Sequence, residues 1–98
     1  MIRGFLVNEK DSVITLLEPG KAGDEIVVAG AKKDLQIQLN EDVQAGHKAA
    51  CRDIKRGEQV IKYGLSIGVA LCDIRVGEWV HTHNIASRYS GDNRGDGA

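Results

Sequence analysis

The chain has 98 residues, the length of one small domain, so a second independently folded domain is not expected. Its 13 basic and 14 acidic side chains nearly cancel, which argues against binding to nucleic acid or to an anionic membrane. No segment has the pattern of a signal peptide or a membrane span, so a cytoplasmic location is expected. Cys51 and Cys72 are accordingly expected to be reduced, buried and structural.

Short apolar runs bounded by Gly, Asp and Asn recur about every ten residues, while helical periodicity is scarce. This pattern predicts a single, mostly β domain with short turns and at most one or two short helices. In chain order, the expected strands are residues 4–7, 12–17, 25–29, 35–39, 48–51, 59–63, 66–71 and 78–84. The strict alternation in residues 35–39 predicts that Leu35, Ile37 and Leu39 lie on one buried face.

A repeated segment is the most informative internal feature. Residues 53–60 recur twenty positions later as residues 73–80, and a looser copy precedes both as residues 42–49. Each copy predicts a turn that leads into a strand, in which Asp caps local amides, Ile or Val enters the core and Gly takes a positive φ. Glu58 and Glu78 follow the glycines, and we expect them to close these turns on backbone amides or nearby cations rather than to act as catalytic carboxylates.

The last residues of the sequence are too polar and too rich in glycine to bury themselves. We therefore expect a domain of residues 1–86, followed by a flexible polar tail or the start of a linker at residues 87–98.

The three histidines are the strongest candidates for chemistry, because imidazole titrates near neutrality, binds metals and hydrogen-bonds to hydroxyl and carboxylate groups. His81 and His83 would share one face of the expected strand with Trp79, and His47 takes the place in the loose repeat that the other two copies give to Glu. Two interpretations stay open. A His-x-His pair can bind Zn or Fe, but a histidine beside a tryptophan is also often a partly buried residue held by a backbone carbonyl.

Five segments together, by their order and spacing, resemble the SAF domain of the altronate and galactarate dehydratases. They are residues 45–49 (Ala-Gly-His-Lys-Ala), 53–57, 60–64, 67–68 and 73–84, the last ending in His-Thr-His-Asn. The resemblance runs from about residue 35 to residue 85, and residues 5–28 fit only in outline. It implies the fold called a β-clip.

The resemblance also implies an activity. Enzymes of this family remove water from a sugar acid with the help of a divalent metal, which we expect to be Fe²⁺ or Mn²⁺ held mainly by a large catalytic chain. His47 and His83 are then the expected catalytic residues and candidate metal ligands, and Lys48, His81 and Asn84 are expected to bind substrate. The 98-residue chain alone would be inactive, because it would be a small subunit or an N-terminal domain of the larger enzyme. The resemblance is also compatible with a homo-oligomer of this chain.

Two alternatives remain at this stage. Sulfolactate sulfo-lyase is a relative with a short α subunit of this type, and it expels sulfite where the dehydratases expel hydroxide. SAF domains also occur in pilus and flagellar assembly factors, so a binding or assembly module without a catalytic role is open as well.

Overall fold

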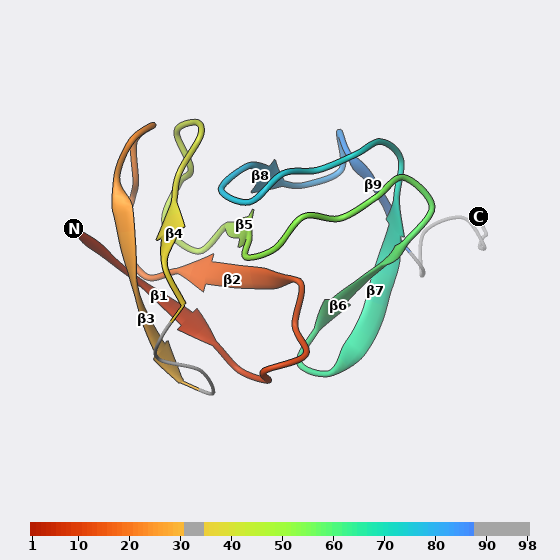
Figure 1. Cartoon of the computed structure of the whole chain (residues 1–98), viewed down its shortest axis with the longest axis horizontal. Coiled ribbons are helices and arrows are strands. Elements are labelled where there is room, and N and C mark those ends of the chain that lie inside the picture. The colour runs from red at the N-terminus through yellow and green to blue at the C-terminus, as the bar shows by residue number, and fades with distance from the viewer. Residues whose placement is uncertain (31–34, 88–98) are drawn as a thin grey trace.

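The computed structural model describes residues 1–30 and 35–87, and every regular element in this part of the chain is a β-strand (Figure 1). The strands are β1 (Ile2–Leu6), β2 (Val13–Leu16), β3 (Glu25–Gly30), β4 (Ile37–Gln38), β5 (Lys48–Ala50), β6 (Gln59–Lys62), β7 (Leu65–Ala70), β8 (Trp79–Val80) and β9 (Ile85–Ser87). The prediction of a mostly β domain is confirmed. No helix among these residues is long and apolar enough to cross a membrane.

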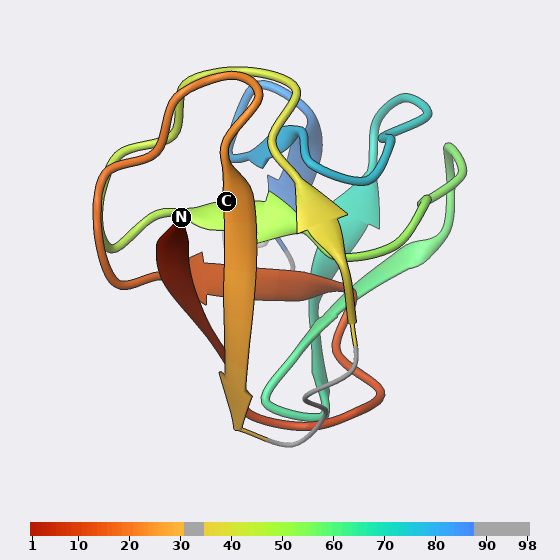
Figure 2. The same ribbon diagram turned by 60° about the vertical axis from the view of Figure 1, so that its left-hand side comes forward.

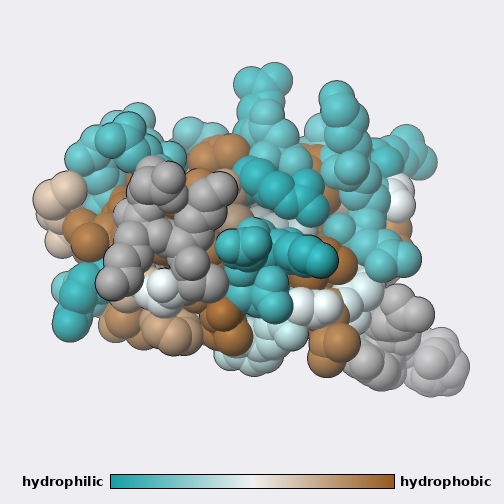
Figure 3. Space-filling model, turned by 60° about the horizontal axis from the view of Figure 1, so that its bottom comes forward, coloured by the Kyte–Doolittle hydropathy of each residue, from teal (hydrophilic) through white to brown (hydrophobic). Residues whose placement is uncertain are grey.

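The strands form two sheets: in Figure 1 the larger extends from the left-hand side to the middle of the molecule and the smaller lies on the right, and Figure 2 brings the larger sheet to the front. The larger sheet has the order β4-β3-β1-β2-β5-β8, and the smaller has the order β6-β7-β9. β1 pairs with β3 in parallel, and the other neighbouring strands pair antiparallel. On the face at the bottom of Figure 1, polar side chains gather near the middle and apolar ones lie between and around them (Figure 3).

The ladder between β2 and β5 separates two hydrophobic clusters. Val13 pairs with Ala50 and Ile14 pairs with Ala49, and successive side chains of a strand point to opposite faces. Ile14 and Ala49 accordingly belong to the cluster of the large sheet, and Val13 and Ala50 belong to the cluster next to the small sheet. These four side chains are at most 2 % exposed, so this ladder is buried on both faces.

The repeated turns lie in pairs. An isolated bridge joins Ile54 to Ile74, and both side chains are only 1 % exposed. The Asp at the start of each turn accepts a backbone N–H from the other turn: Asp53 from Val76 and Asp73 from Arg56. These aspartates do cap backbone amides, but the amides belong to the other turn of the pair, which corrects the expectation that they are local.

A fourth turn, at residues 19–26, completes a second pair with the loose repeat. Gly20 bridges to Val43, and Asp42 accepts the N–H of Ala22, as Asp73 does from Arg56 in the first pair. Sequence reasoning missed this copy because Pro19 and Gly20 stand where the other copies have Asp followed by Ile or Val. The part of the repeat pattern that this turn keeps is the Gly, the acidic residue and the start of a strand, at residues 23–26.

Most of the expected strands are present, with ends that differ by a few residues. In the segment 35–39, Ile37 and Leu39 are buried and Leu35 is partly buried, as the alternation predicted, although only Ile37–Gln38 pairs as a strand. The expected strand at 78–84 is wrong beyond Val80, and β9 was not predicted. Apart from Ser87 in β9, the expected tail lies outside the described residues.

Gly57 and Gly77 occupy equivalent places in paired turns, with φ of 88° and 89°. A Cβ on Gly57 would meet open space, whereas a Cβ on Gly77 would press against the backbone carbonyl of Gln38. Gly57→Ala should therefore lower the free energy of unfolding by about 1–2 kcal/mol, the cost of a left-handed L-residue. Gly77→Ala should have the same cost and lower the free energy of unfolding by about 1–3 kcal/mol more, because of the clash. Urea denaturation of both variants checks this, and equal losses would contradict it.

The two cysteines differ in environment. Cys51 is buried and its thiol donates to the carbonyl oxygen of Asp11 at 3.2 Å, as expected of a structural thiol. Cys72 is exposed, which corrects the expectation that both are buried, and both are free thiols. Cys72 lies where the chain leaves β7 and begins a turn, so its side chain does not reach the hydrophobic core.

Burial raises the pKa of the Cys51 thiol to about 11. Because the thiolate is the reactive form, a thiol reagent such as iodoacetamide should modify Cys72 at pH 8 and leave Cys51 unmodified until the chain is unfolded. Since the folded-state pKa is raised, the stability that the neutral Cys51 thiol contributes should be full below pH 9 and be lost as the pH rises through about 11. Mass spectrometry of the modified peptides tests the order, and equal labelling of the native chain would refute it.

Candidate functional site

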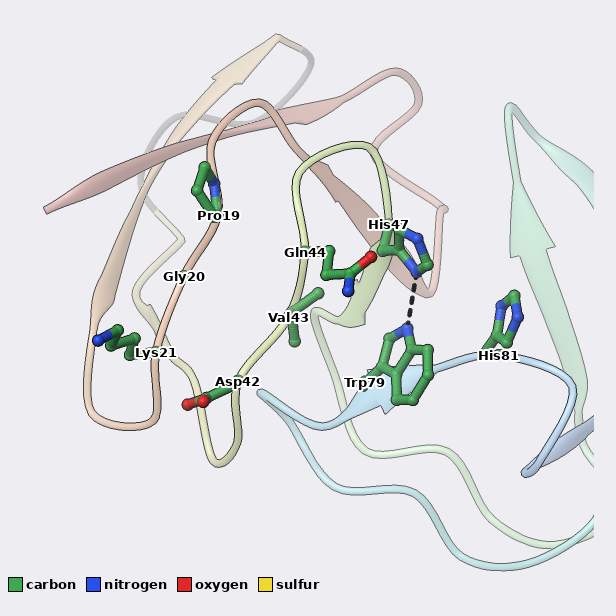
Figure 4. A pocket seen from close by; sticks show the side chains of 9 residues that line it. All are labelled: Pro19, Gly20, Lys21, Asp42, Val43, Gln44, His47, Trp79 and His81. Carbon is green, nitrogen blue, oxygen red and sulfur yellow. Dashed lines mark hydrogen bonds between the residues drawn. The ribbon is translucent and has the colours of Figure 1, made fainter.

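A groove of about 570 Å³ lies between the second pair of turns and strand β8 (Figure 4). Its walls come from three segments: the turn that follows β2, the turn that leads into β5, and β8 with the residue after it. The lining residues are Pro19, Gly20, Lys21, Asp42, Val43, Gln44, His47, Trp79 and His81. Two of the three histidines therefore face the same space.

Trp79 is the centre of an aromatic cluster at one end of this groove. Its indole Nε1 donates a hydrogen bond to Nδ1 of His47 at 3.2 Å (Figure 4). His81 stacks on the indole with ring centroids 5.1 Å apart and planes 10° apart, and His83 lies at 4.9 Å with a tilt of 37°. The expected neighbourhood of His81 and His83 with Trp79 is confirmed, whereas the contact of His47 with Trp79 was not predicted.

The segment 81–84 is a turn, which corrects the expected strand. The side chain of Asn84 causes the reversal: its Oδ1 accepts the N–H of His81 at 2.9 Å, and its Nδ2 donates to the carbonyl of Trp79 at 2.8 Å. Asn84 is 5 % exposed, so both of its polar groups serve the backbone in a buried place. Its expected substrate-binding role stays a prediction.

His47 departs from the pattern of the four turns. In the other three, the residue after the glycine has a carboxylate that accepts the first N–H of its own turn, which confirms the structural interpretation of Glu58 and Glu78. The pairs are Asp24 with Lys21, Glu58 with Lys55, and Glu78 with Arg75. An imidazole replaces that carboxylate at His47, and its ring turns to Trp79 instead. The side chain of His47 therefore takes no part in closing its own turn.

Lys48 lies on the other face of β5. It pairs with Val80, whereas Ala49 pairs with Trp79, so alternation places His47 with Trp79 and Lys48 on the opposite side. Lys48 is half-buried, and desolvation together with the positive charge of Lys62 lowers its pKa. The groove-lining residues of the described chain do not include Lys48. Its expected contact with substrate stays a prediction.

A family model for the SAF domain of altronate and galactarate dehydratases matches residues 2–88. The chain belongs to this family. The match extends through the N-terminal strands, where the sequence motifs fitted only in outline.

Four relatives of this SAF domain fall into two kinds. Altronate dehydratases of Bacillus subtilis and Escherichia coli are 32 % and 40 % identical over 84 residues, and the match spans only 16 % of each enzyme. The α subunit of (2R)-sulfolactate sulfo-lyase of Chromohalobacter salexigens is 34 % identical over 88 residues, and there the match spans 94 % of the relative. The same domain is thus related both to a small part of long enzymes and to a whole short subunit.

The described residues of the SAF domain contain no group of three His, Cys, Asp or Glu side chains placed to hold one metal ion. His47 also has one ring nitrogen engaged by Trp79. The side chains of residues 1–30 and 35–87 therefore do not fit a metal ion by themselves.

Asn84→Ala should lower the free energy of unfolding of the SAF domain by about 1–3 kcal/mol, because the partly buried N–H of His81 and carbonyl of Trp79 lose their hydrogen-bond partner. His83→Ala, at an exposed position in the same turn, should stay within about 0.5 kcal/mol. Thermal and urea unfolding followed by circular dichroism measure both. A large loss for His83→Ala would give that histidine a structural role instead.

Proposed function

We propose that this SAF domain supplies part of the active site of a sugar-acid lyase whose remaining part lies on a large catalytic chain. The observation that supports the proposal most is the groove in which Trp79 gathers His47, with His81 stacked beside it. Imidazole groups suit a substrate rich in hydroxyl and carboxylate oxygens, because they donate and accept hydrogen bonds near neutral pH.

The reaction proposed is the loss of water from an aldonate or aldarate. A proton leaves the carbon next to the carboxylate, and the hydroxyl on the neighbouring carbon departs. His83 is exposed beside Trp79, and its ring is suited to move a proton at the substrate. His47 and His81 would hold substrate oxygens in the groove, with Lys48 and Asn84 as further candidates to contact substrate.

The metal and the partner belong to the proposal as well. A divalent ion, Fe²⁺ or Mn²⁺, would lie mainly among ligands of the large chain and would act as a Lewis acid on substrate oxygens. Support for a large partner comes from the relatives: the domain matches 16 % of the altronate dehydratases, and the sulfo-lyase relatives carry the name subunit alpha.

A second candidate is a lyase that acts on a sulfonated acid and expels sulfite. It is favoured by one observation, that the match spans 94 % of the sulfo-lyase α subunit of Chromohalobacter salexigens. Both candidates need the same proton removed from the carbon next to a carboxylate, so the same groove would serve either leaving group.

The test is reconstitution with the large chain of the same source. The 98-residue chain alone should show no turnover, and the mixture should eliminate water from altronate or galactarate in the presence of Fe²⁺ or Mn²⁺. Sulfite release from (2R)-sulfolactate instead would select the second candidate. Turnover by the chain alone, or an unchanged rate of the large chain when this chain is added, would contradict the proposal and leave a binding or assembly role.

In the reconstituted enzyme, His83→Ala should lower kcat by about 10²- to 10⁴-fold, the usual contribution of a general acid or base. The melting temperature should hardly change, because the side chain is exposed. Thr82→Ala, next to it in the same exposed turn, is the matched control and should leave kcat nearly unchanged. Similar kcat values for the two variants would show that His83 is not a catalytic residue.

A further inference from the structure

The hydrogen bond between Trp79 and His47 has a fixed direction. Indole Nε1 carries a hydrogen and has no acceptor capacity, so Nδ1 of His47, 3.2 Å away, must be the acceptor. A neutral imidazole carries one hydrogen only, and with Nδ1 as acceptor that hydrogen lies on Nε2. Trp79 thus selects one tautomer of His47.

We propose that Trp79 is a positioning residue that holds His47 as an Nε2–H donor, and that this donor binds a carboxylate or hydroxyl oxygen rather than a metal ion. The second half of this inference rests on the proposed function, whereas the first concerns this chain alone. Nε2 points away from the indole, and within residues 1–30 and 35–87 it has no hydrogen-bond partner. His47 is half-buried at the groove wall, so the donor is available to an occupant of the groove.

Metal binding by His47 conflicts with this arrangement. Coordination through Nε2 would require the hydrogen to move to Nδ1, where it would face the indole N–H and leave two donors opposed. A histidine that binds a metal normally donates its other N–H to a carboxylate or carbonyl, and Trp79 offers the opposite polarity. Coordination through Nδ1 would require the indole to withdraw. His47 is therefore better suited to an anionic or hydroxylated ligand than to a cation.

The surroundings of the indole keep it in place for this task. The ring of His81 stacks on the indole, with the ring centroids 5.1 Å apart. The backbone carbonyl of Trp79 accepts a hydrogen bond from the side-chain amide of Asn84. The backbone N–H of Trp79 donates to the carboxylate of Glu41 at 3.0 Å. The stacking with His81 orients the indole plane, and the two backbone hydrogen bonds hold the segment that carries the indole.

The decisive measurement is the tautomer of His47 in the 98-residue chain, read from long-range ¹H–¹⁵N NMR correlations at about pH 8, above the ordinary imidazole pKa. Wild-type His47 should be mainly the Nε2–H form. Trp79→Phe keeps an aromatic ring and removes the N–H, so the preference for this form should fall about fivefold, the value of one ordinary hydrogen bond. His83 contacts the indole ring but accepts no hydrogen bond from it within the described residues, so its tautomer ratio should not change and serves as the internal reference. A wild-type Nδ1–H form, or the same ratio in Trp79→Phe, would overturn the assignment.

The donor role is tested in the reconstituted enzyme with two amide replacements. The amide of Gln extends about as far as Nε2 and can donate from there, whereas the shorter amide of Asn stays near Nδ1. His47→Gln should retain most of the substrate affinity, and His47→Asn should raise KM by about tenfold or more. Equal KM values would refute the donor role. If reconstitution yields no enzyme at all, the proposed function fails while the tautomer result stands by itself.

Discussion

Burial of β2 and β5 on both faces is the constraint on which the rest of the structure depends. A strand between two clusters has no solvent face, so its residues must be apolar and, at the closest approach, small, as Ala49 and Ala50 are. The same alternation decides on which side of the sheet the side chains at the start of β5 lie. The side chain of His47 lies on the side of Ala49 and Trp79, and that of Lys48 lies on the side of Val80. The position of the candidate site is therefore set by core packing two residues away.

The paired turns explain how the side chain of His47 became available for contacts outside its own turn. Three of the four turns use a carboxylate after the glycine to close on their own backbone, so that position is structural by default. His47 gives up this bond, and the turn persists because its backbone still closes from His47 N to Gln44 O at 3.1 Å. The pair also holds through the bridge of Gly20 with Val43. Because the backbone bond closes the turn as well, the turn tolerates the loss of the carboxylate at this position.

Local pattern sufficed for the features that depend on neighbours in sequence. The alternation at 35–39 gave the correct buried face, and the Asp, Gly and Glu of the repeats gave the correct turns. Two features could not be predicted in this way. The indole of Trp79 meets His47 across 32 positions of chain, which only the β5–β8 pairing brings together. The turn at 81–84 forms because the Asn84 side chain captures two backbone groups, and a strand-like sequence pattern does not reveal that competition.

The direction of one hydrogen bond bears on how the work of a lyase would divide between two chains. An imidazole nitrogen that donates a hydrogen bond cannot also bind a cation, so a chain that fixes His47 as a donor leaves metal binding to other ligands. The described residues include no group of three side chains suited to a metal. The groove walls instead offer hydrogen-bonding side chains around an aromatic centre. In the proposed enzyme, such a surface would complement the oxygens of a substrate whose opposite side faces a metal on the large chain, and neither part would suffice alone.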